Sequence, residues 1–168
     1  FLSSLSIHFL KIFCLALIES PVSFCVVAKE DAKVIGFVSG TINMNVFYKY
    51  FLLHYFFNSF FILLPKVFSS LKNILETLLY PTKEQSLPRA ELLTIALVKE
   101  FQGKGVASAM LSLFIFEMKK RNVDIFKVVV GEELKPAINF YEKNNFVFVK
   151  NINIHGKAVS RAYTYKIL

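Results

Sequence analysis

Hydrophobic and polar positions in the first part of the chain predict one helix followed by two strands. Residues 1–19 place apolar side chains at helical spacing, which predicts an amphipathic helix. This segment has no basic start and no small-residue cleavage site, so we do not interpret it as a signal peptide. Short apolar runs at 23–29 and 33–42 flank a polar turn at 30–32. These runs predict a β-hairpin.

The second half of the chain alternates between strand and helix patterns. The predicted elements are a strand at 90–98, a helix at 107–120, a strand at 124–130, a helix at 135–144 and a final hairpin of 146–150 with 161–167. The buried stripe of the first of these helices is expected to hold Met110, Leu111, Phe114 and Met118. Simple alternation in the strand 90–98 places Glu91, Leu93, Ile95 and Leu97 on one face and Leu92, Thr94, Ala96 and Val98 on the other.

Residues 43–80 do not fit this alternation. The stretch 46–64 is apolar, rich in Phe and close to the length of a membrane span. Lys49, His54 and Asn58 oppose a span, and Pro65 ends the run. We therefore expect an inserted helical pair whose second helix covers 67–79, and association with a membrane surface is a less favoured alternative.

Composition narrows the classes of function. A chain of 168 residues has the length of one domain, and its net charge of +8 suits an anionic ligand. Its Lys and Arg residues form no dense patch, so we expect no nucleic-acid partner. Cys14 and Cys25 are expected to be buried, reduced thiols of a cytoplasmic protein, with a disulfide as the alternative, and the scattered histidines predict no metal site. Because the chain begins with Phe1, a fragment that lacks a first strand is a further expectation.

The segment from Gln102 to Ala107 has the composition of a phosphate-binding loop. It joins a predicted strand to a predicted helix, and such loops hold anions with backbone N–H groups and the helix dipole. Its glycine spacing does not fit a Walker A loop, and Ser108 stands where a dinucleotide loop needs Gly or Ala. The acyl-CoA pyrophosphate pattern, Gln/Arg-x-x-Gly-x-Gly/Ala, is matched by Gln102, Gly105 and Ala107. An ordinary connection with two turn glycines is the alternative.

Two blocks of sequence around this loop resemble the GCN5-related N-acetyltransferase (GNAT) superfamily. Residues 90–107 resemble its "AEL..IAV.PE(Y/F)QGKGVG" block, and residues 137–146 resemble its "A..FYEKLGF" block. The resemblance covers 36–168. It implies a mixed α/β (α+β) fold with a splayed, mostly antiparallel central sheet flanked by helices. We expect one GNAT domain over 1–168, with the helical insert at about 43–80.

The resemblance also implies an activity, which is transfer of an acetyl group from acetyl-CoA to a primary amine. A small-molecule amine is slightly favoured over a protein amine. The family's strand at 90–98 bulges near its end and separates from the next strand, which admits the pantetheine arm. The cofactor-binding residues implied in this way are Ile95, Ala96, Leu97, Gln102, Gly103, Lys104, Gly105, Val106, Ala107, Ser108 and Tyr141.

Two side chains are candidates for proton transfer. By resemblance Glu91 is the general base that deprotonates the amine, and a surface glutamate at a strand start is the alternative. Tyr141 of the "FYE" block is the candidate acid for the departing thiolate, with a packed tyrosine as the alternative. The N–H of Leu97 is the expected donor to the oxyanion.

The chain departs from the family pattern at three positions. Lys99 replaces a common Pro, Leu134 replaces the usual Asn, and Asn145 replaces a Gly although it tolerates positive φ. Leu134 weakens the expected grip on the cofactor. A non-catalytic CoA-binding module of GNAT type, or a membrane-associated protein that uses its Phe-rich insert, therefore stays as an alternative, and homodimerisation stays open.

Overall fold

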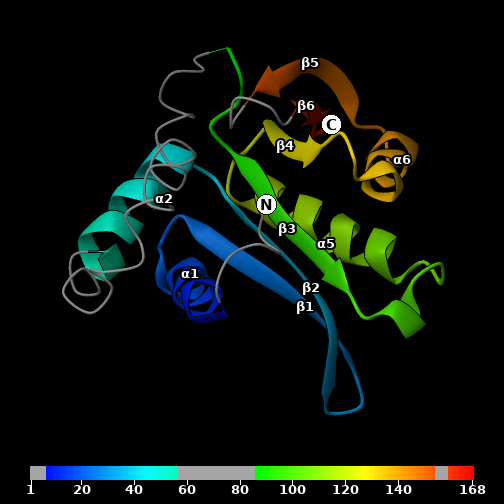
Figure 1. Cartoon of the computed structure of the whole chain (residues 1–168), viewed down its shortest axis with the longest axis horizontal. Helices are drawn as coiled ribbons and strands as arrows, with labels where there is room; N and C mark the ends of the chain where they lie inside the picture. The colour runs from blue at the N-terminus through cyan, green and yellow to red at the C-terminus, as the bar shows by residue number, and fades with distance from the viewer. Residues whose placement is uncertain (1–6, 57–85, 154–158) are drawn as a thin grey trace.

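The computed structural model describes residues 7–56, 86–153 and 159–168 (Figure 1). Within these ranges the chain forms a sheet of six strands in the order β1-β2-β3-β4-β6-β5. The strands are β1 (Ser23–Glu30), β2 (Lys33–Thr41), β3 (Glu91–Leu97), β4 (Ile125–Gly131), β5 (Val147–Asn153) and β6 (Val159–Lys166). The helical elements are α1 (Ile7–Glu19), α2 (Met44–Phe51), the π-helical turn η2 (Leu52–Phe56), the 3-10 turn η3 (Lys99–Phe101), α5 (Val106–Lys120) and α6 (Lys135–Lys143).

Helices cover both faces of the sheet. Figure 1 shows α1 in front of β1 and β2, and α5 behind the sheet. On the α5 face the stripe predicted for that helix is buried, and Phe114 stacks on Phe24 at a centroid distance of 5.0 Å. On the opposite face α1 and α2 pack together through a second apolar cluster that includes Phe47 and Phe51. The sheet thus has two separate apolar layers.

The sheet splits between β3 and β4. Every neighbouring pair of strands is antiparallel except this one, which is parallel. It is paired only at Glu91–Lys127 and Leu92–Val128, whereas β4 and β6 pair along the whole of β4. Figure 1 shows β3 and β4 diverging beyond this point. The mixed α/β fold with a splayed, mostly antiparallel sheet is therefore confirmed.

A β-bulge lies in the middle of β3. Ser39 of β2 pairs with Thr94 and Gly40 pairs with Leu92, so Leu93 has no partner. The expected simple alternation is consequently wrong, because the extra residue moves Ile95 and Leu97 to the face of Leu92. Leu93 packs instead on the α1–α2 side. The bulge also lies earlier in the strand than expected.

The described part of the predicted insert begins as a helix. The Asn43 side chain caps α2 by accepting from the N–H groups of Asn45 and Val46 at 3.1 and 3.3 Å. The Met44 N–H donates to the carbonyl of Arg89 at 2.9 Å. This bond joins the two ends of the segment that leaves the sheet after β2 and returns to it at β3. The predicted helix at 67–79 and most of the linker at 81–88 lie outside the described residues. No helix in the part of the chain that the structure describes is long and apolar enough to cross a membrane.

The two cysteines differ from expectation. Cys14 and Cys25 are both free thiols, and both are exposed rather than buried. Cys25 lies on β1, where it pairs with Ser39 of β2.

Candidate active site

The loop that follows β3 presents its backbone at the start of α5. Gly103 and Gly105 have φ of 74° and 82°, a region that glycine adopts without strain. A Cβ atom added at either glycine would meet no atom within 4 Å, so the loop is open at both positions. No side chain caps α5 at Gly105, and the first N–H groups of the helix are therefore available to a ligand. These groups belong to Val106, Ala107 and Ser108, the first turn of α5.

Two side chains of the loop hold it in place. The Gln102 amide donates to the carbonyl of Leu97 at 3.0 Å, which joins the loop to the end of β3. The Lys104 ammonium lies 5.4 Å from the centre of the Phe101 ring. Gln102 thus braces the strand end, and the anion-binding character of the loop resides in its backbone and in Lys104.

Backbone groups of β3 point into the split. The Val98 N–H donates to the carbonyl of Ile35 on β2 at 2.8 Å. Because successive residues of a strand direct these groups to opposite neighbours, the N–H of Leu97 and that of Ile95 point away from β2. Ala96 lies opposite Phe37 and directs its groups toward β2. Of the three residues expected to pair with a pantetheine arm, Ile95 and Leu97 therefore face the split and Ala96 does not.

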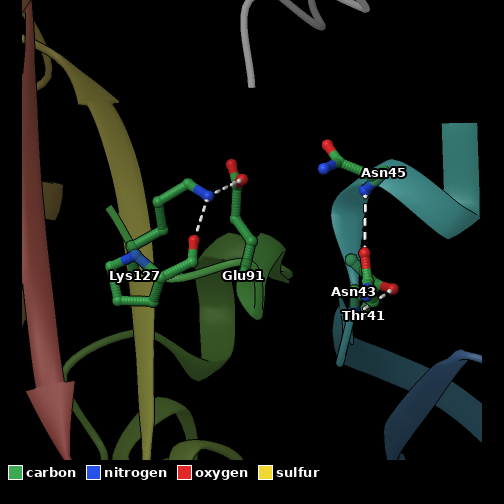
Figure 2. Close-up of polar contacts among 6 residues, drawn as sticks. Thr41, Asn43, Asn45, Glu91 and Lys127 are labelled. Carbon is green, nitrogen blue, oxygen red and sulfur yellow. Dashed lines mark hydrogen bonds and ion pairs between the residues drawn. The ribbon is translucent and has the colours of Figure 1, made fainter. Parts of the chain in front are cut away.

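Glu91 lies at the point where β3 and β4 separate. Its carboxylate is 3.1 Å from the Lys127 ammonium, and its side chain is only 12% exposed. Figure 2 shows Glu91 between Lys127 and the first turn of α2, where Asn43 and Asn45 lie. Burial raises the pKa of Glu91, and the charge and hydrogen bond of Lys127 oppose this effect without cancelling it. The alternative of an exposed surface glutamate is therefore wrong.

Tyr48 is a neighbour of Glu91 that the sequence did not indicate. It lies on α2 with 8% of its surface exposed. Burial raises the pKa of its hydroxyl, and the nearby charge of Glu91 raises this pKa further. An aromatic residue in an apolar helix carries no sequence signal for such proximity, because it depends on how α2 packs on the sheet.

Tyr141 lies on α6 and packs against Phe140 and Phe146. It is 5% exposed, and burial raises the pKa of its hydroxyl well above the ordinary value. Its hydroxyl has no hydrogen-bond partner among the residues that the structure describes. The group is therefore protonated at neutral pH and retains its capacity to donate.

Two of the three departures from the family pattern lie at the ends of α6, and the third, Lys99, begins the 3-10 turn η3. Leu134 precedes the helix, is 49% exposed and provides no side-chain cap, while Pro136 occupies its first turn. Asn145 follows the helix with φ of 64°, so it adopts the left-handed conformation expected of the family's glycine. Among the described residues no three His, Cys, Asp or Glu side chains gather to hold a metal ion.

Comparison with known proteins agrees with this geometry. The family model described as "Acetyltransferase (GNAT) family" matches residues 3–146. The chain therefore belongs to the GNAT acetyltransferase family. No curated protein matches the sequence.

Solved structures share the fold at low sequence identity. The ribosomal-protein-S18-alanine N-acetyltransferase from Escherichia coli is 15% identical with a TM-score of 0.57, and the match covers 94% of this chain and 76% of that one. Ard1 from Thermoplasma volcanium is 17% identical with a TM-score of 0.60, covering 98% and 81%. A GNAT family acetyltransferase from Elizabethkingia anophelis with acetyl-CoA bound is 12% identical with a TM-score of 0.54, covering 96% and 83%.

Proposed function

We propose that this protein transfers an acetyl group from acetyl-CoA to a primary amine of a small molecule or a protein. One observation carries the proposal, which is the opening of the sheet between β3 and β4 beside an uncapped α5. A free strand edge suits the amide groups of the pantetheine arm of coenzyme A. A helix start that is free to bind an anion suits its pyrophosphate.

The loop and the strand divide the binding of the cofactor between them. We assign the pyrophosphate to the loop from Gln102 to Ser108, where the two glycines leave open space and Lys104 adds positive charge. The amide groups of the pantetheine arm would pair with the backbone of Ile95, as an added strand pairs with a sheet edge, which leaves the N–H of Leu97 to face the thioester carbonyl. The bound structure from Elizabethkingia anophelis supports acetyl-CoA as the co-substrate.

The chemistry requires an amine that is neutral when it attacks the thioester. In the proposed reaction Glu91 accepts the amine proton, directly or through water, as the new C–N bond forms. The N–H of Leu97 donates to the carbonyl oxygen as it gains negative charge. The C–S bond then breaks, and Tyr141 protonates the departing thiolate. In this proposal Glu91 is the base, the N–H of Leu97 is the oxyanion donor and Tyr141 is the acid.

The acceptor is proposed only as a class. The Escherichia coli structure is named for an alanine of a ribosomal protein, which supports an α-amine as one candidate. A small-molecule amine remains slightly favoured over a protein amine in this proposal.

Calorimetric titration with acetyl-CoA tests the cofactor site. We expect Gly105→Glu to weaken binding about 100-fold or more, equal to about 2.7 kcal/mol, because it places a carboxylate in the loop and forces a side chain into positive φ. Asn151→Glu, on the exposed surface of edge strand β5, makes the same change in charge and should bind normally. A folded parent protein that binds no acetyl-CoA would refute the proposal.

Turnover tests the role of Tyr141. The probes are spermidine and a short peptide with an N-terminal alanine, assayed by release of free thiol. Tyr141→Phe keeps the ring contacts and should lower kcat by about 10²- to 10⁴-fold while acetyl-CoA binding is retained. Binding without turnover of any amine by the parent would instead identify a non-catalytic CoA-binding module.

A further inference from the structure

Strand β4 carries a buried lysine in an otherwise apolar run. Among the described residues Lys127 is the one charged residue that is buried, with 6% of its surface exposed. It stands between Phe126 and Val128, both of which belong to the apolar core. A buried ammonium is costly unless it is paired and hydrogen-bonded, so its contacts indicate why it is present.

Its contacts converge on the start of β3. The Lys127 ammonium donates to the carbonyl of Pro88 at 2.6 Å and lies 3.1 Å from the carboxylate of Glu91. Its backbone N–H donates to the carbonyl of Ala90 at 3.0 Å. Figure 2 shows the ammonium held between the Glu91 carboxylate and a backbone carbonyl. Lys127 therefore fixes the chain on both sides of Ala90.

The position of this ion pair in the sheet is specific. Glu91–Lys127 is one of the two residue pairs that join β3 to β4 before the strands diverge. The carboxylate is thus anchored at the closed end of the split, and the backbone groups of Ile95 and Leu97 lie further along β3 toward its open end. The charge partner on β4 thus holds the carboxylate at the closed end of the split.

We propose that Lys127 is a positioning residue that keeps the Glu91 carboxylate ionised and directed at the closed end of the split, ready to accept the proton of the amine. This inference rests on the proposed function, in which Glu91 is the base. Lys127 touches no reacting atom in this role. It acts by its charge and by its bond to Pro88, which prevents the ammonium from following the carboxylate outward.

Electrostatics around Glu91 supports this role. The titratable groups that face it from the packed elements are Lys127 of β4 and Tyr48 of α2, while its partner on β2 is the uncharged Thr41. Burial raises the pKa of Glu91 and Lys127 lowers it. Without the ammonium, burial would act unopposed, and the carboxyl group would stay protonated to higher pH.

The test measures the pKa of Glu91 directly, by NMR titration of ¹³C-labelled glutamate carboxyls, with Glu91→Gln to assign the signal. Lys127→Gln removes the charge but retains a donor for Pro88, and Lys127→Met removes both. We expect each to raise the pKa of Glu91 by about one unit or more. Lys127→Arg retains the charge and should leave the pKa near the parent value. Urea unfolding establishes that each variant is folded.

Turnover gives the second readout. The acid limb of kcat/KM for acetyl transfer to the alanine peptide or spermidine should move to higher pH by the same amount as the pKa of Glu91. An unchanged pKa in Lys127→Gln and Lys127→Met would overturn the inference, and so would a raised pKa with an unmoved acid limb. A parent protein that acetylates no amine would refute the proposed function, whereas the NMR titration would still show whether Lys127 controls Glu91.

Discussion

Gly40 offers a sharp test of the packing that places Glu91. It lies on β2 opposite Leu92, next to the bulge at Leu93. A Cβ atom added to Gly40 would be 2.5 Å from the carbonyl oxygen of Glu91 and 2.6 Å from two ring atoms of Phe114. The Glu91 oxygen is a backbone atom and the Phe114 ring is fully buried. Moving either of them aside would therefore lower the stability of the fold.

The magnitude follows from these two contacts. Overpacking a core by one methyl group costs about 1–3 kcal/mol, and the upper end applies where backbone as well as a buried ring must shift. We therefore expect Gly40→Ala to lower the free energy of unfolding by about 3 kcal/mol. For a chain of this size that change corresponds to a fall in Tm of roughly 6–12 °C.

Urea unfolding of Gly40→Ala and Gly131→Ala side by side tests the reasoning. Gly131 also lies in a strand, but an added Cβ would meet only the carboxyl end of the Glu133 side chain, which can rotate away. We expect Gly131→Ala to change the free energy of unfolding by less than about 1 kcal/mol. Equal effects of the two substitutions would refute the argument, because they would show that the close contacts at Gly40 do not determine the cost.

Two further predictions concern α2 and Glu91. Asn43→Ala removes the cap of α2 and should cost about 1 kcal/mol in urea unfolding, while Asn45→Ala, which leaves that cap in place, should cost much less. The pKa of Glu91 is raised in the folded protein, so the folded state binds its proton more tightly than the unfolded chain does. The unfolding free energy of the parent relative to Glu91→Gln should therefore fall as the pH rises above the ordinary glutamate pKa of 4.5, and level off above the folded pKa. A difference that stays constant with pH would contradict this sign.

Periodicity and motifs predicted most of the fold. The side of the sheet on which each side chain of β3 lies could be determined only from the structure. The hairpin of β1 and β2 and the buried stripe of α5 follow from regular spacing. A single unpaired residue, Leu93, reverses the alternation after it, and no residue type marks a bulge at that position. The order of strands in the sheet likewise depends on pairing between distant segments.

The site was predicted only in part for a similar reason. The glycines at 103 and 105 have the positive φ that their loop requires, and a local motif can indicate this. Lys127 and Tyr48 reach Glu91 from other elements of the fold. The sequence offered one signal for the role of Lys127, which is its charge within the apolar run of β4. A lysine in such a run needs a charged or hydrogen-bonding partner.

The bond between the Met44 N–H and the Arg89 carbonyl has a consequence for how this chain can change during evolution. This hydrogen bond joins the two ends of the segment between β2 and β3. It therefore holds the end of β2 close to the start of β3. The entropy cost of closing a loop grows only with the logarithm of its length, so added residues between α2 and β3 would raise this cost only slightly. Descendants of this sequence could therefore change the length of the chain between α2 and β3 while Glu91 and the loop before α5 keep their places.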